Sequence, residues 1–176
     1  MKKIGLFFGT ETSKTSKIGK KIKEAFGDAD IDIIAIEEAS AEDFEKYDNI
    51  IAGASTWFDG ELPSYWDELL PDLESVKMKG KKVAIFGLGD QVKYPDNFAD
   101  GIGILAKLFE TNGAKVVGFT SPEGYKFDHS EALKDGKFLG LVIDYENQAS
   151  KNEERISNWV AQLKQELNLS LIHISE

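Results

Sequence analysis

Residues 3–21 read KIGLFFGTETSKTSKIGKK, and this stretch decides how the rest of the chain is interpreted. It opens with the apolar run 4–9, which is too short for a helix and is typical of a strand buried on both faces. Four hydroxyl side chains follow within six residues: Thr10, Thr12, Ser13 and Thr15. Apolar residues then recur at helical spacing, at Ile18, Ile22 and Phe26. The stretch therefore predicts a strand, a hydroxyl-rich turn and a helix, in that order.

The hydroxyl-rich turn is a candidate phosphate site. The first turn of a helix has unpaired N–H groups and a partial positive charge, both of which attract an anion. Hydroxyl groups can donate to the same oxygens. Neither a Walker sequence nor G-x-G-x-x-G is present, however. An ordinary helix cap with surplus serine and threonine remains an alternative for this segment.

Composition narrows the class of protein. A length of 176 residues suits one domain, and 31 acidic against 21 basic residues give a net charge of −10. Nucleic acid and anionic membranes are poor partners for such a chain, whereas basic protein surfaces are favourable ones, unless the charge serves solubility alone. No apolar run is long enough to span a bilayer and no signal peptide is visible, so we expect a cytoplasmic monomer without membrane insertion.

The residues that usually bind metals or form thiolates are scarce. The chain has no cysteine, which excludes disulfides, thiolate catalysis and iron–sulfur sites. Its two histidines, His129 and His173, lack the spacing of metal ligands, so no metal site is expected. No catalytic set for substrate turnover is apparent either.

Strand and helix patterns alternate along the chain. After the first strand, apolar runs predict further strands at 31–36, 49–54, 82–87 and 115–119, and a polar stretch, 121–136, precedes a further strand-like run at 138–143. Helical spacing lies between them, at 63–73, 98–109 and 156–167. The alternation predicts an α/β fold with a five-stranded, doubly wound parallel sheet.

Three loops should meet at the carboxyl edge of that sheet: 10–15, 55–62 and 88–97. The second contains Trp57 and the third contains Tyr94, two aromatic rings that could cover the faces of a flat ligand whose phosphate sits in the first loop. The alternative is that both aromatic side chains simply cap the hydrophobic core.

With these segments identified, the chain resembles the flavodoxins, and in particular their long-chain group. Several ordered segments between Lys3 and Leu167 carry the resemblance. They are TETSKT at 10–15, STW at 55–57, GLGDQ at 87–91 with Tyr94 and DNF at 96–98, GYKFD at 124–128, and GKFLGL at 136–141. The stretch 121–136 has the placement of the insertion that splits the fifth strand in long-chain members.

The resemblance implies a non-enzymatic, low-potential one-electron carrier that binds FMN non-covalently. It also implies the strand order 2-1-3-4-5, for which flavodoxins are themselves the standard example. Partners implied by the family are basic redox proteins such as ferredoxin–NADP reductase, photosystem I or nitrogenase.

Site roles also follow from the resemblance, position by position. The phosphate would be bound by hydroxyls of Thr10, Thr12 and Thr15 and by backbone N–H groups of Glu11, Ser13 and Lys14. The ring system would be covered by Trp57 on the inner face and Tyr94 on the outer face. Its polar edge would be contacted by Asp90, Thr56 and Asn97, by the Phe58–Asp59 peptide with Gly60, and by the loop at Leu88 and Gly89.

Three positions depart from the family pattern. Ser13 stands where glycine is usual, and it would be strained if that position required a positive φ. Phe58 replaces a smaller or polar residue beside the ring, and Leu88 stands where a hydroxyl is common. Acidic residues around the ring, at Asp59, Glu61, Asp67, Asp90, Asp96 and Glu146, would disfavour an added negative charge and dock basic partners.

Two rival functions remain open at this point. One is a flavin-dependent NAD(P)H–quinone reductase of related fold, which would need an exposed ring face. The other is a binding module that has lost FMN. We assign residues 1–168 to the domain and expect 169–176 to be a non-native or disordered tail.

Overall fold

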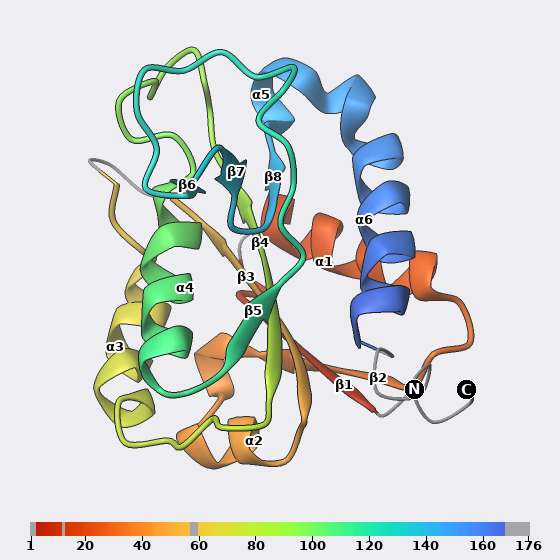
Figure 1. The fold of residues 1–176 in the computed structure, drawn as a ribbon, viewed down its shortest axis with the longest axis vertical. Helices are drawn as coiled ribbons and strands as arrows, with labels where there is room; N and C mark the ends of the chain where they lie inside the picture. Colours follow the sequence, from red (N-terminus) through yellow and green to blue (C-terminus); the bar gives the residue numbers. More distant parts are fainter. Residues whose placement is uncertain (1–2, 12, 57–59, 168–176) are drawn as a thin grey trace.

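The computed structural model describes residues 3–11, 13–56 and 60–167. Its strands are β1 (Ile4–Phe8), β2 (Ile31–Ala35), β3 (Asn49–Ser55), β4 (Lys82–Leu88), β5 (Lys115–Val117), β6 (Leu133–Lys134), β7 (Lys137–Phe138) and β8 (Leu141–Ile143). Its helices are α1 (Ser13–Phe26), α2 (Ala41–Glu45), α3 (Ser64–Leu73), α4 (Asp100–Thr111), α5 (Tyr145–Gln148) and α6 (Asn152–Leu167), with 3₁₀ turns η1 (Ile36–Glu38) and η2 (Ala149–Lys151). Figure 1 shows their arrangement.

The main sheet is parallel and has the strand order β2-β1-β3-β4-β5, which confirms the predicted fold class. The apolar run that opens the chain lies in its middle: Ile4 pairs with Ile31 of β2 on one side and with Asn49 of β3 on the other. All five residues of β1 are buried, as expected for a strand covered on both faces.

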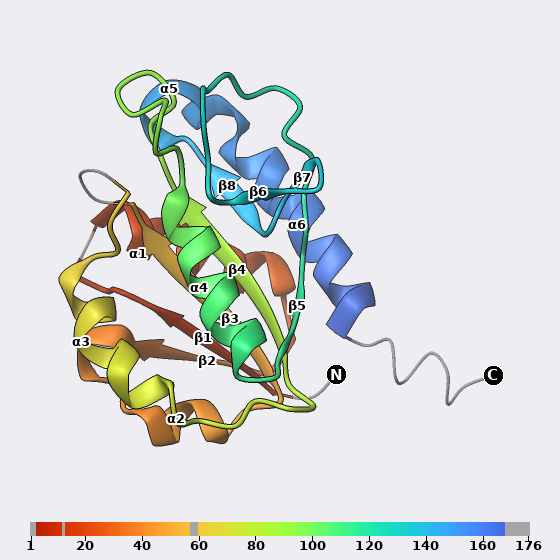
Figure 2. The same cartoon turned by 60° about the vertical axis from the view of Figure 1, so that its left-hand side comes forward.

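The fifth strand is split, as the resemblance implied. Both β5 and β8 pair in parallel with β4: β5 at Lys82–Ala84 and β8 at Phe86–Leu88. The chain between them forms the small antiparallel pair β6–β7. In Figures 1 and 2 this insertion lies beside the loop that follows β4. Main-chain bonds join the two, because Asp128 and His129 both donate N–H groups to the Pro95 carbonyl, at 2.8 and 2.9 Å.

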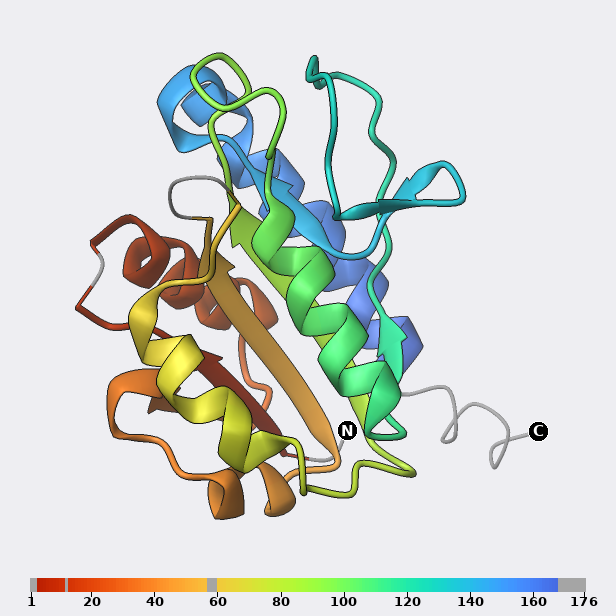
Figure 3. The same cartoon turned by 90° about the vertical axis from the view of Figure 1, so that its left-hand side faces the viewer.

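Two hydrophobic cores lie on opposite faces of the sheet. One contains buried residues of α3 and α4, including Trp66, Leu69 and Phe109, together with Ile50 and Val83 of the sheet. The other contains buried residues of α1 and α6, including Ile18, Ile22, Trp159 and Leu163, together with Phe86. Figure 3 shows α3 and α4 in front of the sheet and α1 and α6 behind it. Among the described residues no helix combines the length and apolar character needed to cross a membrane.

The start of α2 has a capping box, whereas α4 begins later than its apolar spacing predicts. Ser40 caps α2 in a capping box, in which its N–H donates to Asp43 at 2.9 Å. The spacing placed Phe98 on the fourth helix, but α4 begins only at Asp100, after Ala99 in the left-handed region (φ 54°). Phe98 instead stacks on Phe127 of the insertion, with ring centroids 5.2 Å apart. The helical pattern therefore begins two residues before the helix itself, because Phe98 packs on the insertion.

Gly140 allows the insertion to return onto β4, and its replacement should test that contact. A Cβ atom there would lie 2.0 Å from the Ile85 carbonyl oxygen in the middle of β4. We expect Gly140→Ala to lower the free energy of unfolding by about 2–3 kcal/mol, because neither backbone can move aside. Gly136→Ala is the control: it has a positive φ of 80° but nothing within 4 Å, and should cost about 1 kcal/mol. Equal losses in urea denaturation would contradict this interpretation.

Candidate functional site

A cavity of about 470 Å³ opens at the carboxyl ends of the central strands. Strand register aligns those ends, since Ser55 of β3 pairs with Leu88 of β4, and Leu88 pairs with Ile143 of β8. The lining includes residues after β1, β3, β4 and β8: Lys14, Thr15, Ser55, Thr56, Leu88, Gly89, Asp90, Lys93, Tyr94, Tyr145 and Glu146. Its volume lies within the usual range for a cofactor site.

Two residues that line this cavity, Thr15 and Ser55, carry buried hydroxyl groups. Thr15, in the first turn of α1, is fully buried, and its Oγ1 has no hydrogen-bond partner among the described residues. Ser55, at the end of β3, is half-buried, and its buried hydroxyl oxygen also has no hydrogen-bond partner among the described residues. A buried hydroxyl left unpaired costs about 1–3 kcal/mol, so both positions fit a polar ligand in the cavity.

Ser13 is accommodated without strain. It is the first residue of α1, and residues of a right-handed α-helix have a negative φ. The position therefore does not need glycine here, and the serine side chain is exposed at the start of the helix.

The chain between β1 and α1 is held by a carboxylate from the neighbouring strand. Glu37 lies in η1, directly after β2, and accepts the N–H groups of Thr10 and Glu11 at 3.0 and 2.7 Å. The Glu11 amide, which the resemblance assigns to a phosphate, thus donates to Glu37 in this structure. Thr10, Glu11 and Ser13 are exposed beside the cavity.

Asp90 organises the loop after β4. Its Oδ1 accepts the N–H groups of Val92 and Lys93 at 3.1 and 2.9 Å, and the Asn147 side-chain amide at 2.8 Å. Burial alone would raise the pKa of Asp90, but these hydrogen bonds outweigh it and the pKa is lowered. The loop presents Tyr94 at the cavity with 38% of its surface exposed and with the Lys93 ammonium 5.5 Å from the ring centroid.

A buried carboxylate, that of Asp144, connects this loop to the insertion through Gln91. Asp144 is fully buried at the end of β8, and its Oδ2 accepts the N–H and the side-chain amide of Gln91 at 3.1 and 2.6 Å. The Gln91 side-chain oxygen accepts the N–H of Lys126 in the insertion at 2.6 Å. Asn147 donates to both Asp144 and Asp90. Three segments far apart in the sequence are thereby fixed around one side of the cavity.

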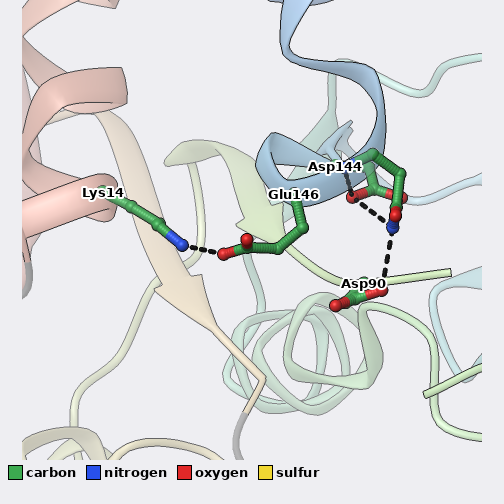
Figure 4. A network of polar contacts seen from close by, with 5 residues as sticks. Lys14, Asp90, Asp144 and Glu146 are labelled. Atoms are coloured by element: carbon green, nitrogen blue, oxygen red, sulfur yellow. Dashed lines mark hydrogen bonds and ion pairs between the residues drawn. The ribbon is translucent and has the colours of Figure 1, made fainter. Parts of the chain in front are cut away.

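Lys14 and Glu146 form an ion pair at the mouth of the cavity (Figure 4), and the Lys14 ammonium also lies 5.8 Å from the Tyr145 ring centroid. The sequence predicts Glu146 among the acidic residues near the ring but does not indicate Lys14 as its partner. Three further residues line the cavity that were not predicted as site residues: Ser55, Lys93 and Tyr145. Tyr145 follows the last strand directly, and that position could have indicated it.

Of the remaining predicted residues that the structure describes, Thr56 lines the cavity, whereas Asn97 and Gly60 are not among its lining residues. The Thr56 hydroxyl accepts the N–H of Gly101 at 2.9 Å, so this lining residue also holds the start of α4. The Asn97 side chain points to Asp100, whose pKa is raised by burial. Gly60 has a φ of 90° and lies so close to Asp100 that a Cβ would be 2.5 Å from its Oδ2. Thr12, Trp57, Phe58 and Asp59 lie outside the described residues.

Comparisons with known proteins point to one family. The sequence model of the family Flavodoxin matches residues 6–159. The chain is 50% identical to a flavodoxin of Trichodesmium erythraeum over 171 residues, covering 96% of this chain and 100% of the relative. It is 45% identical to a flavodoxin of a Nostoc species over 168 residues, covering 96% and 99%. A crystal structure of Fusobacterium nucleatum flavodoxin bound to flavin mononucleotide matches with a TM-score of 0.91 and 34% identity, covering 94% of this chain and 99% of that one.

The two acidic residues on either side of Tyr145 should differ in their contributions to stability. Asp144→Ala leaves the N–H and the side-chain amide of the buried Gln91 without their acceptor, and we expect the free energy of unfolding to fall by about 3 kcal/mol. Glu146→Ala removes an exposed ion pair and should cost less than about 1 kcal/mol. The measurement is urea denaturation of both variants. A comparable loss in each would show that the Asp144 network does not stabilise the fold as described.

Proposed function

The chain belongs to the flavodoxin family, and from this membership we propose that it binds FMN non-covalently in the cavity at the carboxyl ends of β1, β3, β4 and β8. Flavodoxins are electron-transfer proteins and not enzymes, so the function of this chain is to carry electrons between redox proteins. The observation that carries the assignment of the site is the fully buried Thr15 hydroxyl, which has no partner among the described residues.

The donors present fit a phosphate group at the start of α1. The Thr15 hydroxyl, the N–H groups of the first helical turn, which have no acceptor within the helix, and the partial positive charge of the helix terminus all favour a dianion there. The Lys14 ammonium adds a positive charge at the cavity mouth, where Glu146 balances it. We propose that Thr10, Thr12, Ser13 and Lys14 complete the phosphate site.

The other side of the cavity fits a flat aromatic group. Tyr94 provides an aromatic face, and Leu88 an apolar wall beside it. Asp90, Gly89, Thr56, Asn97 and Gly60 are proposed to contact the polar edge of the ring. Trp57 is proposed to cover the opposite face, with the Phe58–Asp59 peptide beside the ring.

FMN supplies the redox chemistry when bound, because it can accept and release electrons one at a time. The chain sets the conditions for that chemistry. Tyr94 limits access of water and of hydride donors to one ring face, which favours a carrier over the rival quinone reductase. Asp90 is ionised at neutral pH, since its pKa is lowered, and it places a negative charge at the cavity. A charge 8 Å away disfavours an added negative charge by about 2 kcal/mol at an effective dielectric of ~20, which lowers the reduction potential.

The net charge of −10 supports basic redox proteins as partners. We propose ferredoxin–NADP reductase, photosystem I or nitrogenase as candidates, and the cytoplasm as the compartment. We also propose that residues 1–168 form one cofactor-binding domain and that 169–176, outside the described residues, contribute nothing to it.

Removal of the Thr15 hydroxyl should weaken FMN binding. Titration of the apoprotein with FMN, followed by quenching of flavin fluorescence, should give a dissociation constant in the nanomolar range for the wild-type chain. Thr15→Ala should raise it at least about tenfold, because the phosphate loses one charge-assisted hydrogen bond. Thr15→Ser keeps the hydroxyl and should restore most of the affinity. An alanine variant that binds FMN as tightly as the wild type would contradict the proposed phosphate site.

Electron transfer to a basic partner should slow as salt increases. Attraction between the acidic chain and a basic protein speeds their encounter, and the attraction is screened over about 10 Å at 0.1 M ionic strength. We expect stopped-flow rate constants with ferredoxin–NADP reductase to fall steadily as ionic strength rises above that value. A rate that does not depend on salt would exclude charge steering of this partner. Mixing with NADPH alone should give no rapid reduction, whereas a quinone reductase would be reduced directly.

A further inference from the structure

Glu37 contacts the loop after β1 although it is 26 residues away from it in the sequence. Strands β1 and β2 are paired in parallel up to Phe8 and Ala35, so the turn η1 begins where β1 passes into the loop. From this turn the two carboxylate oxygens of Glu37 each accept one backbone N–H, from Thr10 and from Glu11. The carboxylate therefore accepts hydrogen bonds from two consecutive backbone amides of the loop.

Glu37 is held in its charged form by this contact. Burial would raise its pKa, but hydrogen bonds from the N–H of Glu11, from its own N–H and from Thr10 outweigh burial, and the pKa is lowered. The next residue, Glu38, lies in the same turn but is exposed to solvent. Of two adjacent carboxylates, one holds the loop and the other remains on the surface.

We propose that Glu37 is a positioning residue for the phosphate loop: it fixes the Thr10 and Glu11 amides, and the ligand phosphate is bound by the Thr15 hydroxyl and the first turn of α1. The inference rests on the proposed function, and it replaces the expectation that the Glu11 amide binds the phosphate. Because the Thr10 and Glu11 amides are held by Glu37 before the ligand arrives, less conformational entropy is lost on binding.

Loss of the Glu37 charge should weaken FMN binding, which is the opposite of what charge repulsion alone would give. A negative charge near a dianion repels it, so on charge alone the neutral variant Glu37→Gln would bind FMN more tightly. Glutamine offers one acceptor where the loop presents two N–H groups, and the loop would lose a charge-assisted bond. We therefore expect weaker binding from Glu37→Gln.

The test compares FMN with riboflavin, which has the same ring but no phosphate. Wild type, Glu37→Gln and the matched control Glu38→Gln are each titrated with both ligands by fluorescence quenching. We expect Glu37→Gln to raise the dissociation constant for FMN about tenfold and to change that for riboflavin less than about twofold, and Glu38→Gln to change neither. Unchanged riboflavin binding also shows that the variant is folded.

Three results would overturn the inference. Glu37→Gln could bind FMN as tightly as the wild type or more tightly. It could lose affinity for FMN and riboflavin by the same factor, which would assign Glu37 a general structural role, or Glu38→Gln could show the same selective loss. Failure of the wild-type chain to bind either ligand would instead contradict the proposed function, and the inference with it.

Discussion

The parallel pairing of β1, β3, β4 and β8 is the constraint on which the site depends. These strands point the same way, and β3, β4 and β8 end at the same level, because Ser55, Leu88 and Ile143 are neighbours in register. The strand β1 ends at Phe8, beside Gly53 of β3. Loops that are far apart in the sequence therefore converge at one edge. Thr15 and Ser55, with their buried hydroxyls, and Tyr94 line the same cavity there. A slip in this register would separate the groups without removing any of them.

Carboxylates hold the loops of the site in place. Asp144 fixes Gln91, Asp90 fixes the turn that leads to Tyr94, and Glu37 fixes the start of the phosphate loop. Each accepts backbone N–H groups that the loop itself cannot pair, which is a general requirement for irregular segments near a protein interior. Some of the acidic residues of the chain thus stabilise its loops, in addition to any attraction of basic partners.

The strands of the main sheet and the helices α1, α3, α4 and α6 could be predicted from sequence because each has a local pattern, such as the apolar run of β1. The short elements β6 and α5 were not predicted. Glu37 and Asp144 could not be predicted, because nothing local distinguishes them among 31 acidic residues and their partners lie 26 and 53 positions away. Phe98 was misplaced for a related reason: its helical spacing is real, but its packing partner is in the insertion.

The central claim is that the cavity above β1, β3 and β4 binds flavin phosphate at the start of α1 and a flavin ring beside Tyr94. A crystal structure of the chain grown with FMN tests it most directly. The account predicts phosphate oxygens within hydrogen-bond distance of the Thr15 hydroxyl and the ring against Tyr94. A flavin located elsewhere on the molecule, with Thr15 still unpaired, would contradict it.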